Sequence, residues 1–355
     1  MGITPGAQCM SRIILGTLLQ SVCCAGLAAA VLVLASCANQ VELAPHLRPL
    51  PQDTLMLLGR KGMDPQAPIL IRIFKEESEL ELWKQRDDGH YYHFKTYPIC
   101  NWSGDLGPKV RYGDRQAPEG FYAIQREQMN PDSKYHLAMN LGYPNAFDRS
   151  WQRNGDALMI HGGCKSAGCY AMTDALIEEI YAIARESFIG GNDTIPVHAF
   201  PFRMSQENMA RFAGHEAYPF WLTIKEGYDY FELTRKLPNV AVCARHYVVN
   251  VALRKGDPSR LDPEAACPAF LKPRPDPFKP RPGEQFADQR IVVPGTKMRS
   301  LASADEATRS GLLSTGSTGT GGSAGGSAGG STGGSTGGSG TVPSLSGGMS
   351  LVPIR

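Results

Sequence analysis

The sequence has no appreciable excess of charge of either sign: 36 Lys and Arg residues stand against 34 Asp and Glu, for a formal net charge of +2 at pH 7. A chain so evenly balanced does not have the basic surface that binds nucleic acid, so we expect no nucleic-acid partner. Charged residues make up 20% of the chain and hydrophobic residues 42%, which is enough for a core. With 355 residues, there is room for one large domain or two small ones.

A stretch near the end of the chain has almost no apolar side chains. Residues 314–340 consist almost entirely of Gly, Ser, Thr and Ala. Such a composition cannot bury apolar surface, and we therefore expect a disordered tail over 301–355. Residues 251–300, which are dense in Pro and basic residues over 268–282, are predicted to form a Pro-rich extension.

The beginning of the chain has the features of a bacterial export signal. Arg12 precedes a long apolar run over 13–35, and residues 34–37 (L-A-S-C) resemble the lipobox of bacterial lipoproteins. The resemblance implies a lipoprotein signal peptide over 1–36, cleavage before Cys37 and lipidation of its thiol. The alternatives are an ordinary signal peptide and an uncleaved membrane anchor.

A lipidated Cys37 would tether the chain to a bilayer while the remainder works in the periplasm. The residue after it is Ala38 rather than the Asp that would suggest inner-membrane retention, so the outer membrane is favoured. Weak patterning, with Pro45, Pro49 and Pro51 stiffening part of the segment, predicts a linker over 37–66.

Between residues 67 and 250, strands predominate among the predicted elements. The first three form an antiparallel meander, because their connecting turns are short and polar. Strands are expected at 69–74, 79–84, 90–99, 120–125, 135–139, 157–160, 197–200 and 240–249. Helices are expected at 174–188, capped by Thr173 or Asp174 and ended by Gly190, and at 219–236, with an interruption near Gly227. Loops are expected at 101–118 and 141–153.

The chemically informative stretch is residues 158–174, L-M-I-H-G-G-C-K-S-A-G-C-Y-A-M-T-D. It begins like a buried strand, passes through a Gly-rich turn and ends in a helical pattern. Glycines in such a turn let the backbone approach a substrate, and its N–H groups can face a developing oxyanion. The turn also carries the thiol of Cys169 and the imidazole of His161, which together are the minimum for a thiolate nucleophile with a base.

This stretch resembles the YkuD-type L,D-transpeptidase family and, more closely, the YafK branch of murein L,D-transpeptidase-like proteins. The family core of His-Gly followed by Ser-x-Gly-Cys corresponds to His161-Gly162 and Ser166-Ala167-Gly168-Cys169. The short spacer between them, and Tyr170-Ala171 in place of the usual aliphatic residue and Arg, are features of that branch. Further similar segments lie at 97–100, 103–109, 113–122, 141–145 and 200–204.

The resemblance implies an α+β catalytic domain over 67–250, mostly β with packed helices, that performs acyl transfer on peptidoglycan stem peptides without a cofactor. Cys169 would attack the carbonyl of the diamino-acid residue in a tetrapeptide stem, a D-amino acid would leave, and an amine would resolve the thioester. The acceptor is a side-chain amine of another stem or a lysine of a wall-anchored lipoprotein. Two alternatives stay open: an amidase of the same branch that detaches a lipoprotein from the wall, and a non-catalytic cell-wall tether.

Each residue of the motif has a predicted role. Because a free thiol with a pKa of ~8.5 is mostly protonated at neutral pH, Cys169 needs a base, and we assign that role to His161. The backbone N–H groups of Gly168 and Cys169, with Tyr170 as a third candidate, are predicted to form an oxyanion hole, and Ser166 to hold the turn. The alternatives are a structural or disulfide-bonded Cys169 and a core His161.

Three further residues are predicted to contact the substrate: Gly162, Tyr170 and Arg203. Arg203 follows a strand and could bind a substrate carboxylate bidentately, with a structural ion pair as the equally weighted alternative. Arg115 and Glu119, in the segment G-D-R-Q-A-P-E-G-F-Y, are interpreted as structural.

The other cysteines of the mature chain are expected to pair. Cys100, Cys164, Cys243 and Cys267 allow three pairings in an oxidising periplasm. Pairing of Cys100 with Cys164 would fix a loop beside the catalytic turn, and pairing of Cys243 with Cys267 would close the end of the domain. A metal site at His161, Cys164 and Cys169, with His198 as a further ligand, is disfavoured because H-x2-C-x4-C is not a common zinc spacing.

Overall fold

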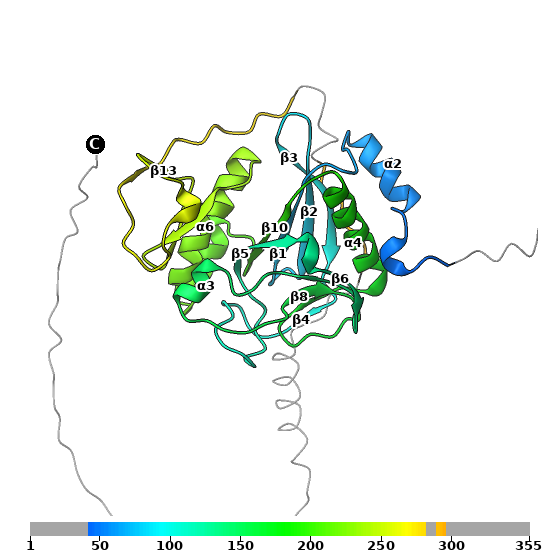
Figure 1. Cartoon of the computed structure of the whole chain (residues 1–355), viewed down its shortest axis with the longest axis horizontal. Coiled ribbons are helices and arrows are strands. Elements are labelled where there is room, and N and C mark those ends of the chain that lie inside the picture. Colours follow the sequence, from blue (N-terminus) through cyan, green and yellow to red (C-terminus); the bar gives the residue numbers. More distant parts are fainter. Residues whose placement is uncertain (1–41, 282–288, 296–355) are drawn as a thin grey trace, which may run out of the picture. The chain divides into compact units, whose positions relative to one another are not determined.

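The structure is a computed structural model that describes residues 42–281 and 289–295. Within these residues, the framework consists of two five-stranded sheets and five α-helices (Figure 1). The predicted signal peptide, the lipidation site Cys37 and the predicted tail over 301–355 lie outside the described residues. Those predictions therefore stay predictions.

The elements have the following bounds. The first sheet contains β1 (Ile69–Phe74), β2 (Glu79–Gln85), β3 (Tyr91–Pro98), β5 (Gly120–Gln125) and β10 (Thr194–Phe200). The second contains β4 (Asn101–Trp102), β6 (Met129–Ser133), β7 (His136–Asn140), β8 (Met159–His161) and β9 (Tyr170–Ala171). Two hairpins are β11 (Val240–Cys243) with β12 (His246–Val249) and β13 (Ala252–Leu253) with β14 (Phe270–Leu271). The helices are α2 (Gln52–Arg60), α3 (Ala146–Ser150), α4 (Asp174–Ile189), α5 (Gln206–Arg211) and α6 (Tyr218–Thr234), with 3-10 helices η1 (Pro45–Leu47), η2 (Arg126–Gln128) and η3 (Pro258–Arg260).

The strand order is β3-β2-β1-β10-β5 in the first sheet and β4-β9-β8-β7-β6 in the second. Strands β1 and β10 are parallel, as are β8 and β9, and all other neighbours within these two sheets are antiparallel. The predicted meander of the first three strands is confirmed. The structure combines sheets with packed helices, as the predicted α+β fold class requires.

Strand β1 is buried on both faces, which explains why all its residues except Arg72 are apolar. Successive side chains of a strand point to opposite faces. Ile71 therefore joins the larger core cluster, whereas Phe74 joins a second cluster with side chains of α6 such as Trp221. Arg72 is also fully buried on the α6 side, where its guanidinium is 2.6 Å from Glu232.

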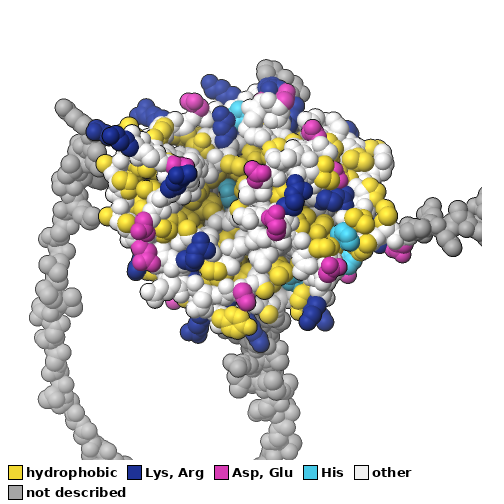
Figure 2. Space-filling view, viewed as in Figure 1, with side chains coloured by type: hydrophobic (Ala, Val, Ile, Leu, Met, Phe, Trp, Pro, Cys, Tyr) yellow, Lys and Arg dark blue, Asp and Glu magenta, His cyan; other side chains and the backbone are white. Residues whose placement is uncertain are grey.

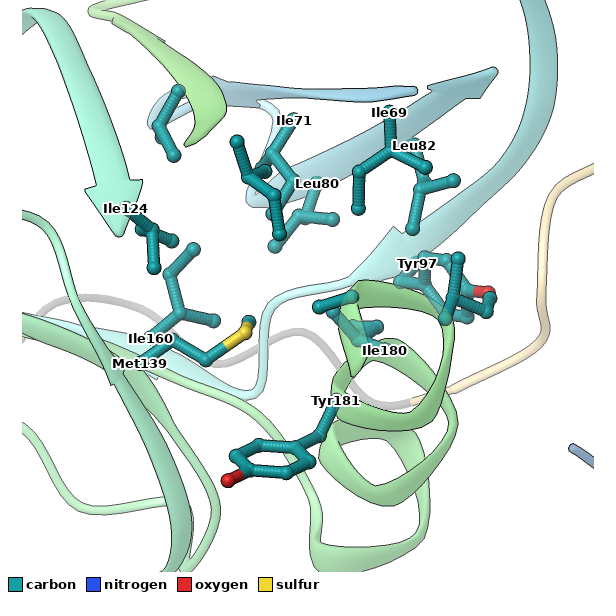
Figure 3. Close-up of a cluster of buried hydrophobic side chains, with 14 of the residues drawn as sticks. Ile69, Ile71, Leu80, Leu82, Tyr97, Ile124, Met139, Ile160, Ile180 and Tyr181 are labelled. Atoms are coloured by element: carbon teal, nitrogen blue, oxygen red, sulfur yellow. The ribbon is translucent and has the colours of Figure 1, made fainter. Parts of the chain in front are cut away.

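The larger core lies between the first sheet, the second sheet and α4. Figure 3 shows Ile71 and Leu80 from the first sheet facing Met139 and Ile160 from the second, with Ile180 of α4 closing the side. All five side chains are fully buried. Because strand β8 contributes Ile160 to this core, the residue that follows it, His161, is held at a fixed place on the sheet.

Helix α4 begins and ends where the sequence predicts, but α6 corrects the prediction. The Thr173 hydroxyl accepts a hydrogen bond from the Leu176 N–H at 3.4 Å, as an N-cap does. Helix α6 continues through Gly227, where an interruption is expected from the sequence. A Cβ added at Gly227 would lie 2.5 Å from the ring of Phe121, so the glycine allows close packing of helix on sheet.

Three regions differ from the sequence prediction. The expected linker over 37–66 contains α2, whose Leu57 and Leu58 pack into the core. The expected loop over 141–153 contains α3, which begins at an Asn145 capping box. The single strand expected over 240–249 is a hairpin, because Ala244 and Arg245 adopt positive φ angles of 48° and 61° and reverse the chain.

The Pro-rich extension is also ordered in part. Cys267 forms a disulfide with Cys243, and β14 pairs with β13. Further on, the Thr96 N–H of β3 donates to the Ile291 carbonyl at 2.7 Å, and the Val293 N–H donates to the Thr96 carbonyl at 2.8 Å. Residues 291–293 thus lie beside β3, at the outer edge of the first sheet.

The surface agrees with the even charge balance of the sequence. Figure 2 shows basic and acidic side chains interspersed over the face in view. Within the described residues, no helix has both the length and the apolar character to cross a bilayer, and the apolar run over 13–35 lies outside them.

Candidate active site

The predicted nucleophile lies in a turn between two neighbouring parallel strands. In the register of β8 and β9, Ile160 is opposite Tyr170 and His161 is opposite Ala171. Cys169, just before β9, therefore lies beside the end of β8. Both Cys169 and His161 line a cavity of about 560 Å³, whose other walls come from 109–115, Tyr135 and 155–158.

The Cys169 thiol is partly buried and is the one free cysteine in the described part of the chain. Burial raises the pKa of this thiol above its ordinary value of 9.0, while the Met159 N–H and the Lys109 ammonium act in the opposite direction. Its Sγ donates to the Ala157 carbonyl at 3.5 Å. The thiol is thus protonated at neutral pH and needs a base to become a nucleophile.

His161 has the protonation state that a base requires. Its Nδ1 donates to the Gly162 carbonyl at 2.6 Å, which leaves the lone pair on Nε2. Burial lowers the pKa of His161 below its ordinary value of 6.5, so the ring is neutral at pH 7. The Tyr135 ring stacks on it with centroids 4.7 Å apart and holds its plane.

Ser166 organises the turn that carries the thiol. Its hydroxyl donates to the Cys169 carbonyl at 2.7 Å and accepts from the N–H groups of Cys169 at 3.1 Å and Gly168 at 3.3 Å. Its oxygen also lies 3.1 Å from the Ser103 hydroxyl. This geometry agrees with the predicted role of Ser166 in holding the turn.

The N–H groups of Gly168 and Cys169, predicted to form an oxyanion hole, both donate to the Ser166 hydroxyl in this structure. Their role toward an oxyanion stays a prediction. Gly168 itself is needed for another reason: it has a φ of +122°, and an added Cβ would lie 3.2 Å from Leu158 and 3.3 Å from the Gln116 carbonyl. Gly168 therefore allows the turn before Cys169 to pack closely against Leu158 and the loop at Gln116.

The three predicted substrate contacts do not line the cavity. The Tyr170 side chain is fully buried and donates to the Pro118 carbonyl at 2.6 Å. The Gly162 N–H donates to the Leu137 carbonyl, and an added Cβ would lie 2.6 Å from Asp174. Both positions are structural parts of the second sheet and its connection to α4.

Arg203 belongs to a different part of the molecule. Its guanidinium lies 2.6 Å from Glu79 and 2.7 Å from Glu81 of β2, and 4.3 Å from the centre of the Phe74 ring. These partners satisfy the side chain, as in the ion-pair alternative, and the prediction that it binds substrate is not supported by its position.

The disulfide between Cys100 and Cys164 joins the connection between β3 and β4 to the turn between β8 and β9, which carries Cys169. Because Cys164 is oxidised, it cannot serve as a thiolate ligand in a metal site with His161 and Cys169. The second disulfide joins Cys243 to Cys267, so this structure contains one of the three possible pairings.

Several residues that line the cavity were not predicted from the sequence. They are Lys109, Tyr112, Arg115, Asp156 and Lys165. Lys109 is buried and pairs with Asp114, whereas Arg115 and Lys165 are exposed. The only sequence signal was the clustering of basic residues with Gly and Pro over 108–118.

Comparison with known proteins identifies the family. The family model of the L,D-transpeptidase catalytic domain (YkuD) matches residues 70–197, which include His161 and Cys169. The chain is 46% identical over 187 residues to "Putative L,D-transpeptidase YafK" of Escherichia coli K12, which covers 53% of this chain and 76% of the relative. The protein of that name from Escherichia coli O157:H7 matches at the same values. The chain belongs to the YkuD-type L,D-transpeptidase family.

Two solved structures are similar in part. The helical cell shape determining protein Pgp2 of Campylobacter jejuni has 18% identity and a TM-score of 0.32, over 53% of this chain and 69% of Pgp2. Bd1075 of Bdellovibrio bacteriovorus has 20% identity and a TM-score of 0.28, over 42% of this chain and 56% of Bd1075.

Proposed function

We propose that the protein is a peptidoglycan L,D-transpeptidase that transfers the acyl group of a tetrapeptide stem to an amine through a Cys169 thioester. The observation that carries the proposal is the shared cavity of Cys169 and His161, with the His161 proton fixed on Nδ1 by Gly162. A protonated thiol facing the same cavity as a neutral imidazole is the starting state of base-assisted thiol attack.

The mechanism needs only these two side chains and the two substrates. Nε2 of His161 accepts the thiol proton as Sγ attacks the carbonyl carbon of the diamino-acid residue. The C–N bond to the terminal D-amino acid then breaks, and the imidazolium returns its proton to the leaving amine. The acceptor amine next attacks the thioester, its proton passes to Nε2, and the thiol is restored when the C–S bond breaks. The acceptor is a side-chain amine of a second stem or a lysine of a wall-attached lipoprotein.

Hydrolysis of the same thioester is the second candidate function. Ala171, which is fully buried, stands where the wider family usually has an Arg after the nucleophile. The site thus lacks one cation of the usual transpeptidase pattern. Water in place of the amine would make the protein an amidase that releases a wall-attached lipoprotein.

The experiment is a turnover assay on the full-length chain in detergent. The substrates are a disaccharide-tetrapeptide and a lipoprotein-linked muropeptide, and the products are identified by mass spectrometry. Cys169→Ala is the test variant, and Lys225→Ala, which removes an ion pair with Asp229 on α6, is the matched control. A Cys169-dependent dimer with loss of a D-amino acid supports the transpeptidase, and release of the lipoprotein with one added water supports the amidase. Absence of any Cys169-dependent product would favour the non-catalytic tether.

We further propose that the chain works in the periplasm as a lipoprotein anchored through Cys37, in the outer membrane. The support comes from the sequence over 12–38. Metabolic labelling with a radioactive fatty acid and membrane fractionation test it. Label and outer-membrane recovery should both disappear in Cys37→Ala, whereas a labelled Cys37→Ala variant would contradict the proposal.

A further inference from the structure

One wall of the cavity is a loop over 109–116, which the Asp114 carboxylate closes by hydrogen bonds. The Asp114 carboxylate accepts the N–H groups of Val110 at 2.8 Å, Arg111 at 2.9 Å and Gln116 at 3.0 Å, and it pairs with Lys109. These partners hold the pKa of Asp114 below its ordinary value. A carboxylate that closes a loop in this way fixes the direction of the side chains that the loop carries.

The loop is joined directly to the turn of the nucleophile. An added Cβ at Gly168 would lie 3.3 Å from the Gln116 carbonyl and 3.9 Å from the carbonyl carbon of Arg115. The Arg115 carbonyl accepts the Ser103 hydroxyl at 2.7 Å, and the Ser103 oxygen lies 3.1 Å from Ser166. The backbone of Arg115 therefore lies next to Gly168, the residue before Cys169, and is linked to Ser166 through Ser103.

The guanidinium of Arg115 has no ion-pair partner in the described part of the chain. Arg115 adopts a φ of +55°, which is uncommon for a residue other than glycine and marks a backbone held by its surroundings. Its side chain is exposed at the cavity, and within residues 42–281 and 289–295 it forms no ion pair. Lys109, by contrast, is paired with Asp114.

We propose that the Arg115 guanidinium binds the C-terminal carboxylate of the donor stem, an inference that rests on the proposed function. Three bonds separate the attacked carbonyl carbon from the carboxylate carbon of the leaving residue, which keeps the carboxylate within about 4 Å of the reaction. A carboxylate so close to Cys169 must lie in the same cavity. The planar guanidinium can hold it with two parallel hydrogen bonds.

The test removes the charge from each partner in turn. The substrates are a tetrapeptide stem with a free C-terminal carboxylate and the same stem with a carboxamide. For the full-length chain in detergent, Arg115→Gln should lower kcat/KM for the carboxylate roughly 10- to 100-fold. The rate with the carboxamide should stay unchanged, and Arg115→Lys should restore part of the preference. Lys225→Gln, which removes a charge on α6 outside the cavity, is the control and should leave kcat/KM for both substrates unchanged.

Binding is measured in parallel so that the inference does not depend on turnover. In a Cys169→Ala background, calorimetry with both peptides should show a loss of affinity in Arg115→Gln for the carboxylate alone. An equal loss for both peptides, or binding of neither, would overturn the role of Arg115. If neither the unmodified chain nor any variant with Cys169 releases a D-amino acid, the proposed function fails. The calorimetry still decides whether Arg115 binds the C-terminal carboxylate.

Discussion

The hydroxyl oxygens of Ser103 and Ser166 lie 3.1 Å apart and link the loop after β4 to the turn that carries Cys169. Ser166 also bonds the backbone of Cys169 on both sides of that residue. We expect Ser166→Ala to lower kcat/KM roughly 10- to 100-fold, because it frees the turn and leaves two N–H groups without their acceptor.

A double-mutant cycle measures this link. Ser103→Ala alone should have a smaller effect, and the double variant should lose less than the sum of the two free-energy changes, because the residues share one network. Strictly additive losses in kcat/KM would show that the two hydroxyls act independently.

The pH dependence of catalysis follows from His161. Burial lowers its pKa below 6.5, and the proposed mechanism uses the neutral ring as the base, so the acid limb of kcat/KM should fall below pH 6.5. Burial also raises the pKa of Cys169 above 9.0, which leaves the protonated thiol and neutral imidazole as the dominant pair between the two limbs. A pH–rate profile checks both, and an acid limb above pH 6.5 would contradict the assignment.

Removal of either disulfide should lower stability, but removal of only one of them should also lower activity. They close segments with sequence separations of 64 and 24 residues, so removal of Cys100–Cys164 should cost about 4 kcal/mol and removal of Cys243–Cys267 about 3 kcal/mol. Paired Cys→Ser variants should both unfold at lower denaturant, but only the first should lower kcat, because Cys164 lies on the turn between His161 and Cys169. Equal losses of kcat would rule out this positioning role.

Gly227 offers a test of the packing of α6 on the first sheet. Gly227→Ala places a methyl group against the Phe121 ring and should destabilise the fold by about 1–3 kcal/mol, although alanine favours helices. The control is Gly59→Ala in α2, where an added Cβ meets nothing within 4 Å; it should stabilise by about 0.5–1 kcal/mol. Denaturant unfolding measures both, and a stabilising Gly227→Ala would contradict the close approach.

Predictions from the sequence succeeded where local signals decide the structure. The β-branched run over 69–74 is β1, and Thr173 caps α4 as its position suggests. The hairpin over 240–249 escaped prediction because Ala244 and Arg245 take positive φ angles that glycine or asparagine usually adopt. The interruption expected at Gly227 was wrong because a tertiary contact, with Phe121, explains that glycine.

The same distinction holds for the site. The sequence could place Cys169, His161 and Ser166 together because they belong to one short motif, and all three line the cavity. Arg115 was interpreted as structural, since its place at the cavity depends on contacts with segments far from it in sequence. For Arg203, substrate binding and an ion pair were weighted equally, since its partners, Glu79 and Glu81, come from a strand more than a hundred residues earlier and could not be identified from the sequence.

The pairing of residues 291–293 with Thr96 decides how far the chain can be shortened. Strand β3 is the outermost strand of the first sheet, and the segment satisfies backbone groups there that would otherwise be free. An uncovered edge invites a strand from another molecule to add to the sheet. A truncated chain ending at residue 281 should therefore self-associate through β3, whereas one that ends beyond residue 295 keeps its own cover over that edge.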